Sequence, residues 1–121
     1  MRPAARTWLT WLGSTKLLVG FIFIAYPALL QSSAYAMAAA IAPFWVWGIY
    51  SMVGGGICIY ARLTENRSVG AVGMGMSMWM QFMFGLSIFA LTLQGVSSAL
   101  TGSIQWWSSA VISLWFLRKG V

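Results

Sequence analysis

Residues 69–93 read VGAVGMGMSMWMQFMFGLSIFALTL, a run without a single charged side chain. A helix of about 20 apolar residues is long enough to cross the hydrocarbon core of a bilayer. Because lipid offers the backbone no hydrogen-bond partners, a run of this length and composition favours a transmembrane helix. The stretch therefore predicts an integral membrane protein rather than a water-soluble domain.

Three further apolar stretches become visible when the chain is divided at polar and turn-like residues. The last of the four is softened by hydroxyl and amide side chains, namely Ser98, Thr101, Ser103, Gln105, Ser108 and Ser109. The connections are short, which makes sequential helices antiparallel neighbours. We therefore expect an all-α fold, a single transmembrane domain over residues 1–121 with four transmembrane helices in two antiparallel hairpins. The expected spans are about 8–31, 43–61, 69–93 and 98–117.

The overall composition supports the same class of protein. Of the 121 residues, 60% are hydrophobic and only 7% are charged, whereas a soluble domain is roughly 25% charged. The formal charge of +6 raises the question of nucleic-acid binding, but seven basic residues spread along the chain do not form a phosphate-tracking stripe. Cys58 is the single cysteine, so an intramolecular disulfide is impossible. The lipid bilayer is the expected partner, and nucleic acid is not.

The basic residues indicate the orientation of the chain in the membrane. They fall in the N-terminal segment, in the middle loop and at the C-terminus, as Arg2, Arg6, Lys16, Arg62, Arg67, Arg118 and Lys119. The other two connections, 31–42 and 94–105, carry no charge. Lys and Arg in short loops favour the cytoplasmic side. With four crossings every charge lies on that side, so we expect a multi-pass protein of the bacterial inner (cytoplasmic) membrane with both termini cytoplasmic and these residues as topology anchors.

A second interpretation of the N-terminal segment stays open. Basic residues, the apolar run 17–30 and then Ala34, Tyr35 and Ala36 form the pattern of a secretory signal peptide with an A-x-A cleavage site. Cleavage would leave three spans. We expect the segment to be retained as the first span.

The residues needed for catalysis or metal binding are scarce. The sequence has no His and no Asp, and its one acid, Glu65, lies between Arg62 and Arg67, where a local ion pair is expected. Proton-coupled transporters place acids or histidines within the membrane, and a metal site or nucleophile needs a cluster of such groups. We therefore expect no enzyme activity and no catalytic, cofactor or metal site. Five methionines of the third stretch are expected to face lipid: Met74, Met76, Met78, Met80 and Met83.

Small and polar residues recur at helical spacing in three of the stretches. They are Gly48, Ser51 and Gly55 in the second, Gly73, Ser77, Gln81 and Gly85 in the third, and Gly102, Gln105, Ser109 and Ser113 in the fourth. Residues three or four apart share a helix face. Such faces either let helices pack closely or line a water-filled path when several copies assemble, with Gln81 as the most polar side chain near mid-membrane. Lys16 is either a snorkelling anchor, which we expect, or a charge at a pore mouth.

Several short motifs carry a resemblance to a known group of proteins. They are the run 41–48 (IAPFWVWG), Gly56, the basic break 62–67, Trp79, the run 101–103 (TGS) and Arg118. From Ala34 onward the chain resembles small four-span membrane proteins of tailed bacteriophages, which are often regarded as holin-like. The resemblance implies no catalytic residue. The chain departs from common holins because it lacks a long charged C-terminal tail.

These observations lead to two expected functions. The first is a holin-like phage membrane protein that forms an oligomer in the inner membrane and permeabilises it, with the small-residue faces as contacts. The alternative is a non-catalytic structural or accessory subunit of a larger membrane or virion complex. The expected partners are the bilayer and either further copies of the chain or other membrane protein subunits.

Overall fold

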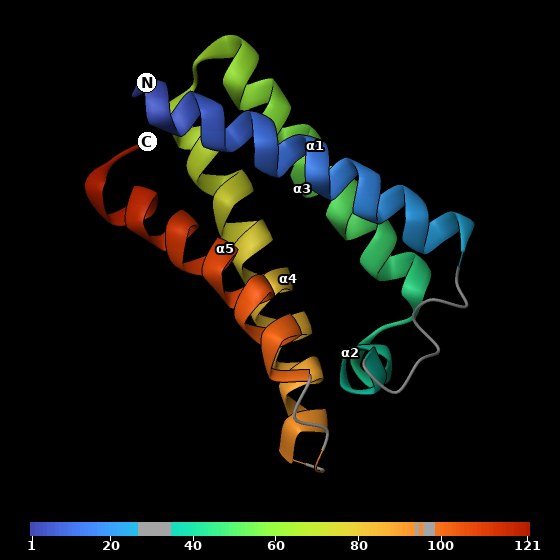
Figure 1. Cartoon of the computed structure of the whole chain (residues 1–121). Coiled ribbons are helices and arrows are strands. Elements are labelled where there is room, and N and C mark those ends of the chain that lie inside the picture. The colour runs from blue at the N-terminus through green and yellow to red at the C-terminus, as the bar shows by residue number, and fades with distance from the viewer. Residues whose placement is uncertain (27–34, 94, 96–98) are drawn as a thin grey trace.

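The protein is helical throughout the part that the computed structural model describes, residues 1–26, 35–93, 95 and 99–121. No strand occurs in these residues, which confirms the all-α class. The helices are α1 (Pro3–Ala25), α2 (Ala36–Ile41), α3 (Phe44–Thr64), α4 (Arg67–Leu93) and α5 (Ala99–Lys119) (Figure 1).

Three of these helices identify the chain as a membrane protein. α1, α3 and α4 up to Ala90 are long and apolar enough to cross a bilayer. Large apolar side chains are exposed around the outside, for example Leu18 at 60%, Phe21 at 59% and Val111 at 64%. In water such a surface would be unfavourable, whereas lipid covers it without cost. α5 is as long as α3, but its many hydroxyl and amide side chains keep it out of this group of three.

The helix boundaries differ from the predicted spans in two places. α1 begins at Pro3 rather than near residue 8, because Pro favours the first helical position, where its missing N–H is not needed. α1 ends at Ala25, and residues 27–34 of the predicted first span lie outside the described part. The short helix α2 lies within the connection predicted at 31–42.

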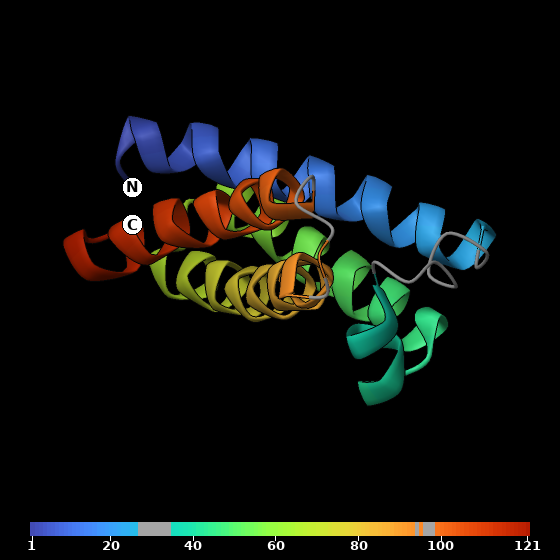
Figure 2. The ribbon, with the colours of Figure 1, turned by 60° about the horizontal axis from the view of Figure 1, so that its bottom comes forward.

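The helices form two packed pairs. α1 packs along α3, α4 packs along α5, and α3 against α4 joins the pairs. Figures 1 and 2 show that the pairs converge at the end of the molecule where both termini lie, and Figure 1 shows them diverging toward the other end. α2 lies at that other end, where Ala38 N–H donates to Ser87 Oγ of α4 (3.4 Å) and Trp47 Nε1 of α3 donates to Ala38 O (2.8 Å).

Glycines bring the backbones of α1 and α3 together. Gly13 lies against Gly55, and Gly20 lies against Gly48, so two contacts recur seven residues apart on both helices. A Cβ atom on Gly55 would lie 2.8 Å from the Gly13 carbonyl oxygen, and one on Gly20 would lie 2.6 Å from the Gly48 carbonyl oxygen. Any larger residue would push the helices apart, so these contacts fix the spacing of the α1–α3 pair.

Two buried clusters occupy the interior. The one near the termini contains Ala5, Leu9, Leu12, Cys58, Ala61, Met74, Phe116 and Val121. The other contains Phe23, Ala38, Trp47, Met80, Met83 and Phe84. Met74, Met80 and Met83 are therefore buried, and the prediction that they face lipid was wrong. α4 packs against both α3 and α5, so methionines on more than one of its faces turn inward, where their flexible side chains fit the packing.

Candidate functional site

Lys16 lies in the interior although it carries a charge. Its side chain is 2% exposed, and its ammonium nitrogen lies 4.8 Å from the centre of the Trp106 ring, a cation–π contact. It follows Gly13 by three residues and precedes Gly20 by four, so it shares their inward face of α1. A snorkelling anchor has an exposed charge, and the burial of Lys16 differs from that expectation. Lys16 is thirteen residues beyond Pro3, about 20 Å along the helix axis.

A cavity of about 260 Å³ borders the Lys16 side chain. We call it the interhelical cavity. Its lining residues are Trp11, Thr15, Lys16 and Val19 of α1, Gln81 of α4, and Gln105, Trp106 and Ser109 of α5. The cavity thus lies between α1 and the α4–α5 pair, and its lining includes one lysine, two glutamines and two hydroxyl residues among apolar surface.

The Gln81 side chain lines this cavity and carries an unsatisfied hydrogen-bond acceptor. It is 3% exposed, and its Oε1 atom has no hydrogen-bond partner in the described part of the chain. A buried acceptor without a partner costs about 1–3 kcal/mol. Since Gln81 lines the cavity, a hydrogen-bond donor inside it, such as a water molecule, is the natural partner.

An aromatic cluster holds the Trp106 ring in place beneath the ammonium group. Trp106 stacks on Phe84 with ring centres 5.2 Å apart. Phe84 in turn contacts Trp47 (5.1 Å), Tyr35 (5.4 Å) and Phe23 (5.5 Å). Because α1, α3, α4 and α5 all contribute rings, the cation–π contact depends on the assembly of both helix pairs.

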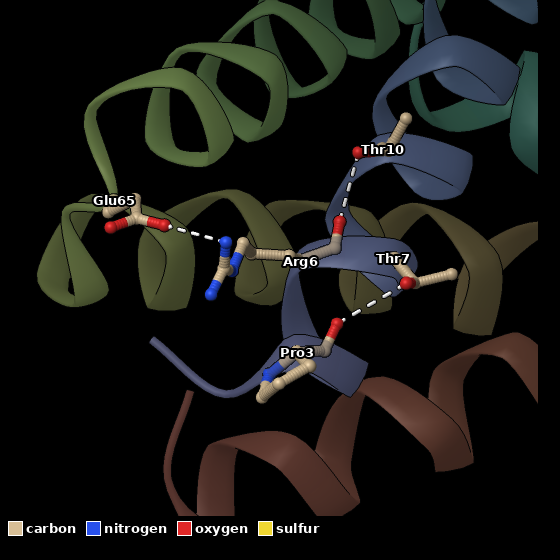
Figure 3. A network of polar contacts seen from close by, with 5 residues as sticks. All are labelled: Pro3, Arg6, Thr7, Thr10 and Glu65. Carbon is tan, nitrogen blue, oxygen red and sulfur yellow. Dashed lines mark hydrogen bonds and ion pairs between the residues drawn. The ribbon is translucent and has the colours of Figure 1, made fainter.

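The sequence provides no carboxylate side chain to neutralise Lys16. Its single acid is Glu65, and Glu65 Oε1 lies 3.0 Å from Arg6 Nη1 of α1 (Figure 3). The predicted local ion pair with Arg62 or Arg67 is therefore replaced by one between helices, because the end of α3 lies beside the start of α1. Both side chains are about half exposed, so the pair contributes at most about 1 kcal/mol.

The remaining anchors lie at the end of the molecule that carries the termini. Arg2 Nη2 donates to the Lys119 carbonyl oxygen (2.8 Å), which ties the start of the chain to the end of α5. Figures 1 and 2 show both termini at this end, and Figure 1 shows the turn between α3 and α4 there as well. The basic residues outside the interior are therefore gathered on one end, as Arg2, Arg6, Arg62, Arg67, Arg118 and Lys119.

The predicted face of the second stretch lies against α1. Gly48 and Gly55 meet the two α1 glycines, and Ser51 Oγ donates to the Lys16 carbonyl oxygen (2.7 Å). This hydroxyl bond lies between the two glycine contacts and fixes α3 at the level of the buried lysine. All three residues therefore serve packing within one chain.

The predicted face of the third stretch divides between two neighbours. Gly73 lies against Cys58 of α3. The Ser77 hydroxyl is buried beside the same thiol without a hydrogen bond of good geometry. Gly85 lies directly against the Trp107 ring of α5, where a side chain would collide with the indole. Only Gln81 of this face turns toward the interhelical cavity.

The predicted face of the fourth stretch also divides. Gly102 approaches Ile88 of α4, and Ser113 Oγ accepts a hydrogen bond from Trp8 Nε1 (3.0 Å). Gln105 and Ser109 line the interhelical cavity. The structure thus brings together three of the predicted residues, from α4 and α5, and adds Lys16 and Trp106, whose meeting no local pattern in the sequence indicates.

A second concave surface lies on the outside of the α4–α5 pair. This apolar groove has a volume of about 680 Å³ and is lined by Gly75, Met78, Trp79, Phe82, Trp107, Ala110, Val111, Leu114 and Leu117. No charged residue lines it. Its chemistry suits lipid chains or another apolar helix rather than a polar solute.

Comparison of the chain with protein-family models, with curated proteins and with solved structures gives no match.

Proposed function

We propose that this chain is a holin-like membrane protein that permeabilises the bacterial inner membrane, and that ions cross it along the interhelical cavity. The observation that supports this proposal is the cavity itself. Polar and ionisable side chains are costly inside a membrane and mark the paths of solutes. Here an ammonium group, two amides and two hydroxyl groups share one cavity between helix pairs.

The proposal includes four crossings in two antiparallel hairpins, with both termini cytoplasmic. The gathering of basic residues at one end supports this orientation. Support for α5 as the fourth span comes from where its polar side chains point. Ser103 and Ser113 are buried, and Gln105 and Ser109 line the interhelical cavity. The side of α5 that faces lipid is therefore more apolar than the composition of the whole helix suggests.

Opening of the path requires the α1–α3 pair to move away from α5. Three described contacts oppose this motion. They are the Lys16–Trp106 contact, the hydrogen bond from Trp8 Nε1 to Ser113 Oγ (3.0 Å) and the hydrogen bond from Arg2 Nη2 to the Lys119 carbonyl oxygen (2.8 Å). The glycine contacts between α1 and α3 stay closed, because they lie within one pair. The conducting state thus differs from the closed state by a separation of pairs.

The apolar groove favours association with another chain. We propose that copies assemble through it into an oligomer, rather than through the small-residue faces, which contact neighbouring helices of the same chain. The same groove supports the second candidate function, a non-catalytic accessory or structural subunit that packs against a larger membrane or virion complex. The two candidates differ in whether the chain alone makes a membrane leaky.

The test is potassium and chloride flux from liposomes that contain the purified chain. We expect flux in the wild type and a strong reduction in Ser109→Val, because an apolar constriction loses its water. Ser108→Val is the matched control, since the neighbouring hydroxyl donates to the Gln105 carbonyl oxygen of its own helix and does not line the cavity. A wild-type chain that leaves both liposomes and induced bacteria fully polarised would favour the accessory subunit.

A further inference from the structure

We infer that the interhelical cavity is a binding site for one monovalent inorganic anion of the halide class, held by the ammonium group of Lys16. The inference starts from a charge without a counter-ion. Lys16 is 2% exposed. The one acidic side chain of the sequence is bound to Arg6, at the end of the molecule that carries the termini.

The Trp106 ring alone does not balance this charge. A cation over an indole face gains from the ring quadrupole, but the ring carries no net charge. A buried ammonium at the depth of the bilayer interior remains strongly unfavourable until an opposite charge approaches it. An anion in the cavity supplies that charge and leaves the ring contact intact.

The rest of the cavity lining is suited to such a guest. Gln81, Gln105 and Ser109 offer N–H and O–H donors, and an anion accepts hydrogen bonds from both kinds. Gln81 is a buried amide at the cavity, and its Oε1 atom has no partner among the described residues. No hydrogen bond to that oxygen opposes a turn of the amide that would point its NH₂ group toward an anion, with a water of the cavity as donor to the oxygen.

Charge and position favour a small monovalent ion over a phospholipid headgroup. One ammonium is balanced by one negative charge. Lys16 lies about 20 Å along α1 from Pro3, far from the basic end where headgroups would gather. A cavity of about 260 Å³ accommodates a halide with several waters, since each water takes about 30 Å³. The site is complete in the closed chain, so binding does not depend on conduction.

The experiment is a titration of tryptophan fluorescence with sodium iodide in detergent, at constant ionic strength set by sodium gluconate. Iodide quenches an indole that it touches, and Trp106 lies beside the proposed site. We expect a saturable quenching component on top of the linear collisional one, and chloride should displace it. Trp106→Phe should remove the larger part of the saturable component, since Trp11 also lines the cavity. Trp79→Phe, which alters an exposed ring on the outer groove, should keep all of it.

Lysine variants test the ammonium directly. Lys16→Met should weaken the saturable component at least about tenfold, because the binding charge is gone, and Lys16→Arg should retain it. Lys119→Met is the matched control, since it removes the other lysine of the chain at the exposed C-terminus. Chloride competition in the wild type keeps the inference testable if Lys16→Met does not fold.

Three results would overturn the inference. The first is quenching that is linear in the wild type. The second is a saturable component that survives Lys16→Met unchanged. The third is a component that phosphatidylglycerol displaces and chloride does not, which would assign the site to a lipid phosphate. Absence of ion flux with saturable, chloride-sensitive quenching would refute the proposed function and leave this inference standing.

Discussion

Gly55 and Gly56 follow one another in α3, yet a side chain at each would have opposite surroundings. A Cβ atom on Gly55 would lie 2.8 Å from the Gly13 carbonyl oxygen and 2.9 Å from the Leu17 backbone nitrogen. On Gly56 it would meet nothing within 4 Å. Backbone atoms of a packed helix cannot yield as a flexible side chain does. The pair therefore separates the effect of helix contact from the effect of helix propensity.

We expect Gly55→Ala to lower the free energy of unfolding by about 1–3 kcal/mol, because α1 must move away from α3. Gly56→Ala should be neutral or stabilise by up to about 1 kcal/mol, since Ala favours the helix. The measurement is unfolding in mild detergent by heat or denaturant. Equal effects of the two substitutions would contradict the close backbone contact.

The turn between α3 and α4 shows how an element boundary is built. Glu65 adopts a left-handed conformation (φ 53°), and the next residue, Asn66, donates its backbone N–H to the Ala61 carbonyl oxygen (3.1 Å), a common way to end a helix. Asn66 also begins α4, because its Oδ1 accepts the Val69 N–H (3.2 Å). One residue thus closes one helix and caps the next.

Asn66→Ala should lower the free energy of unfolding by about 0.5–2 kcal/mol, the usual effect of losing an N-cap side chain. Ser68→Ala in the same exposed first turn of α4 is the control and should change it by less than about 0.5 kcal/mol. The two variants are compared by thermal unfolding in one detergent. A loss in Ser68→Ala as large as in Asn66→Ala would argue against the cap.

At the scale of elements, the positions of the helices, which depend on local composition, were predicted. The contacts that depend on which helices pack together were not. Charge-free runs located α3 and α4 to within a few residues, because lipid-crossing length and apolarity are local properties. Gly48 and Gly55 were singled out as a helix-packing face, but their α1 partners Gly13 and Gly20, which have the same seven-residue spacing, were missed. That spacing becomes meaningful only once α1 is known to pack on α3. The uncharged segment that forms α2 carries no signal that separates it from a loop.

The candidate site was predicted in part for the same reason. Gln81, Gln105 and Ser109 were singled out by helical spacing, and they line one cavity. The burial of Lys16 could not be predicted, because apolar residues occur all around α1 and the sequence does not show which face turns inward. Contacts across the two helix pairs decide that, as they decide the partner of Glu65.

For the whole molecule, the gathering of basic residues predicts which end faces the cytoplasm. A cysteine introduced at Ala39 of α2 should react with a membrane-impermeant thiol reagent added to intact cells. A cysteine at Thr64 should react only after permeabilisation. Both positions are exposed, whereas Cys58 is buried and gives little background. Reaction of Thr64→Cys from outside would contradict the proposed orientation.

Because Cys58 is buried, the rate at which its thiol is alkylated reports how often the contact between α3 and α4 opens. Its sulfur lies at the contact of α3 with Gly73 of α4, and Cys58 does not line the interhelical cavity. An alkylating reagent can reach it only during the moments when α3 and α4 part, so the alkylation rate counts those moments. The alkylation rate thereby distinguishes two motions that a conductance measurement cannot tell apart. The proposed separation of the two helix pairs raises the rate, whereas a path that opens between α1 and α5 alone, with α3 still packed on α4, leaves it unchanged.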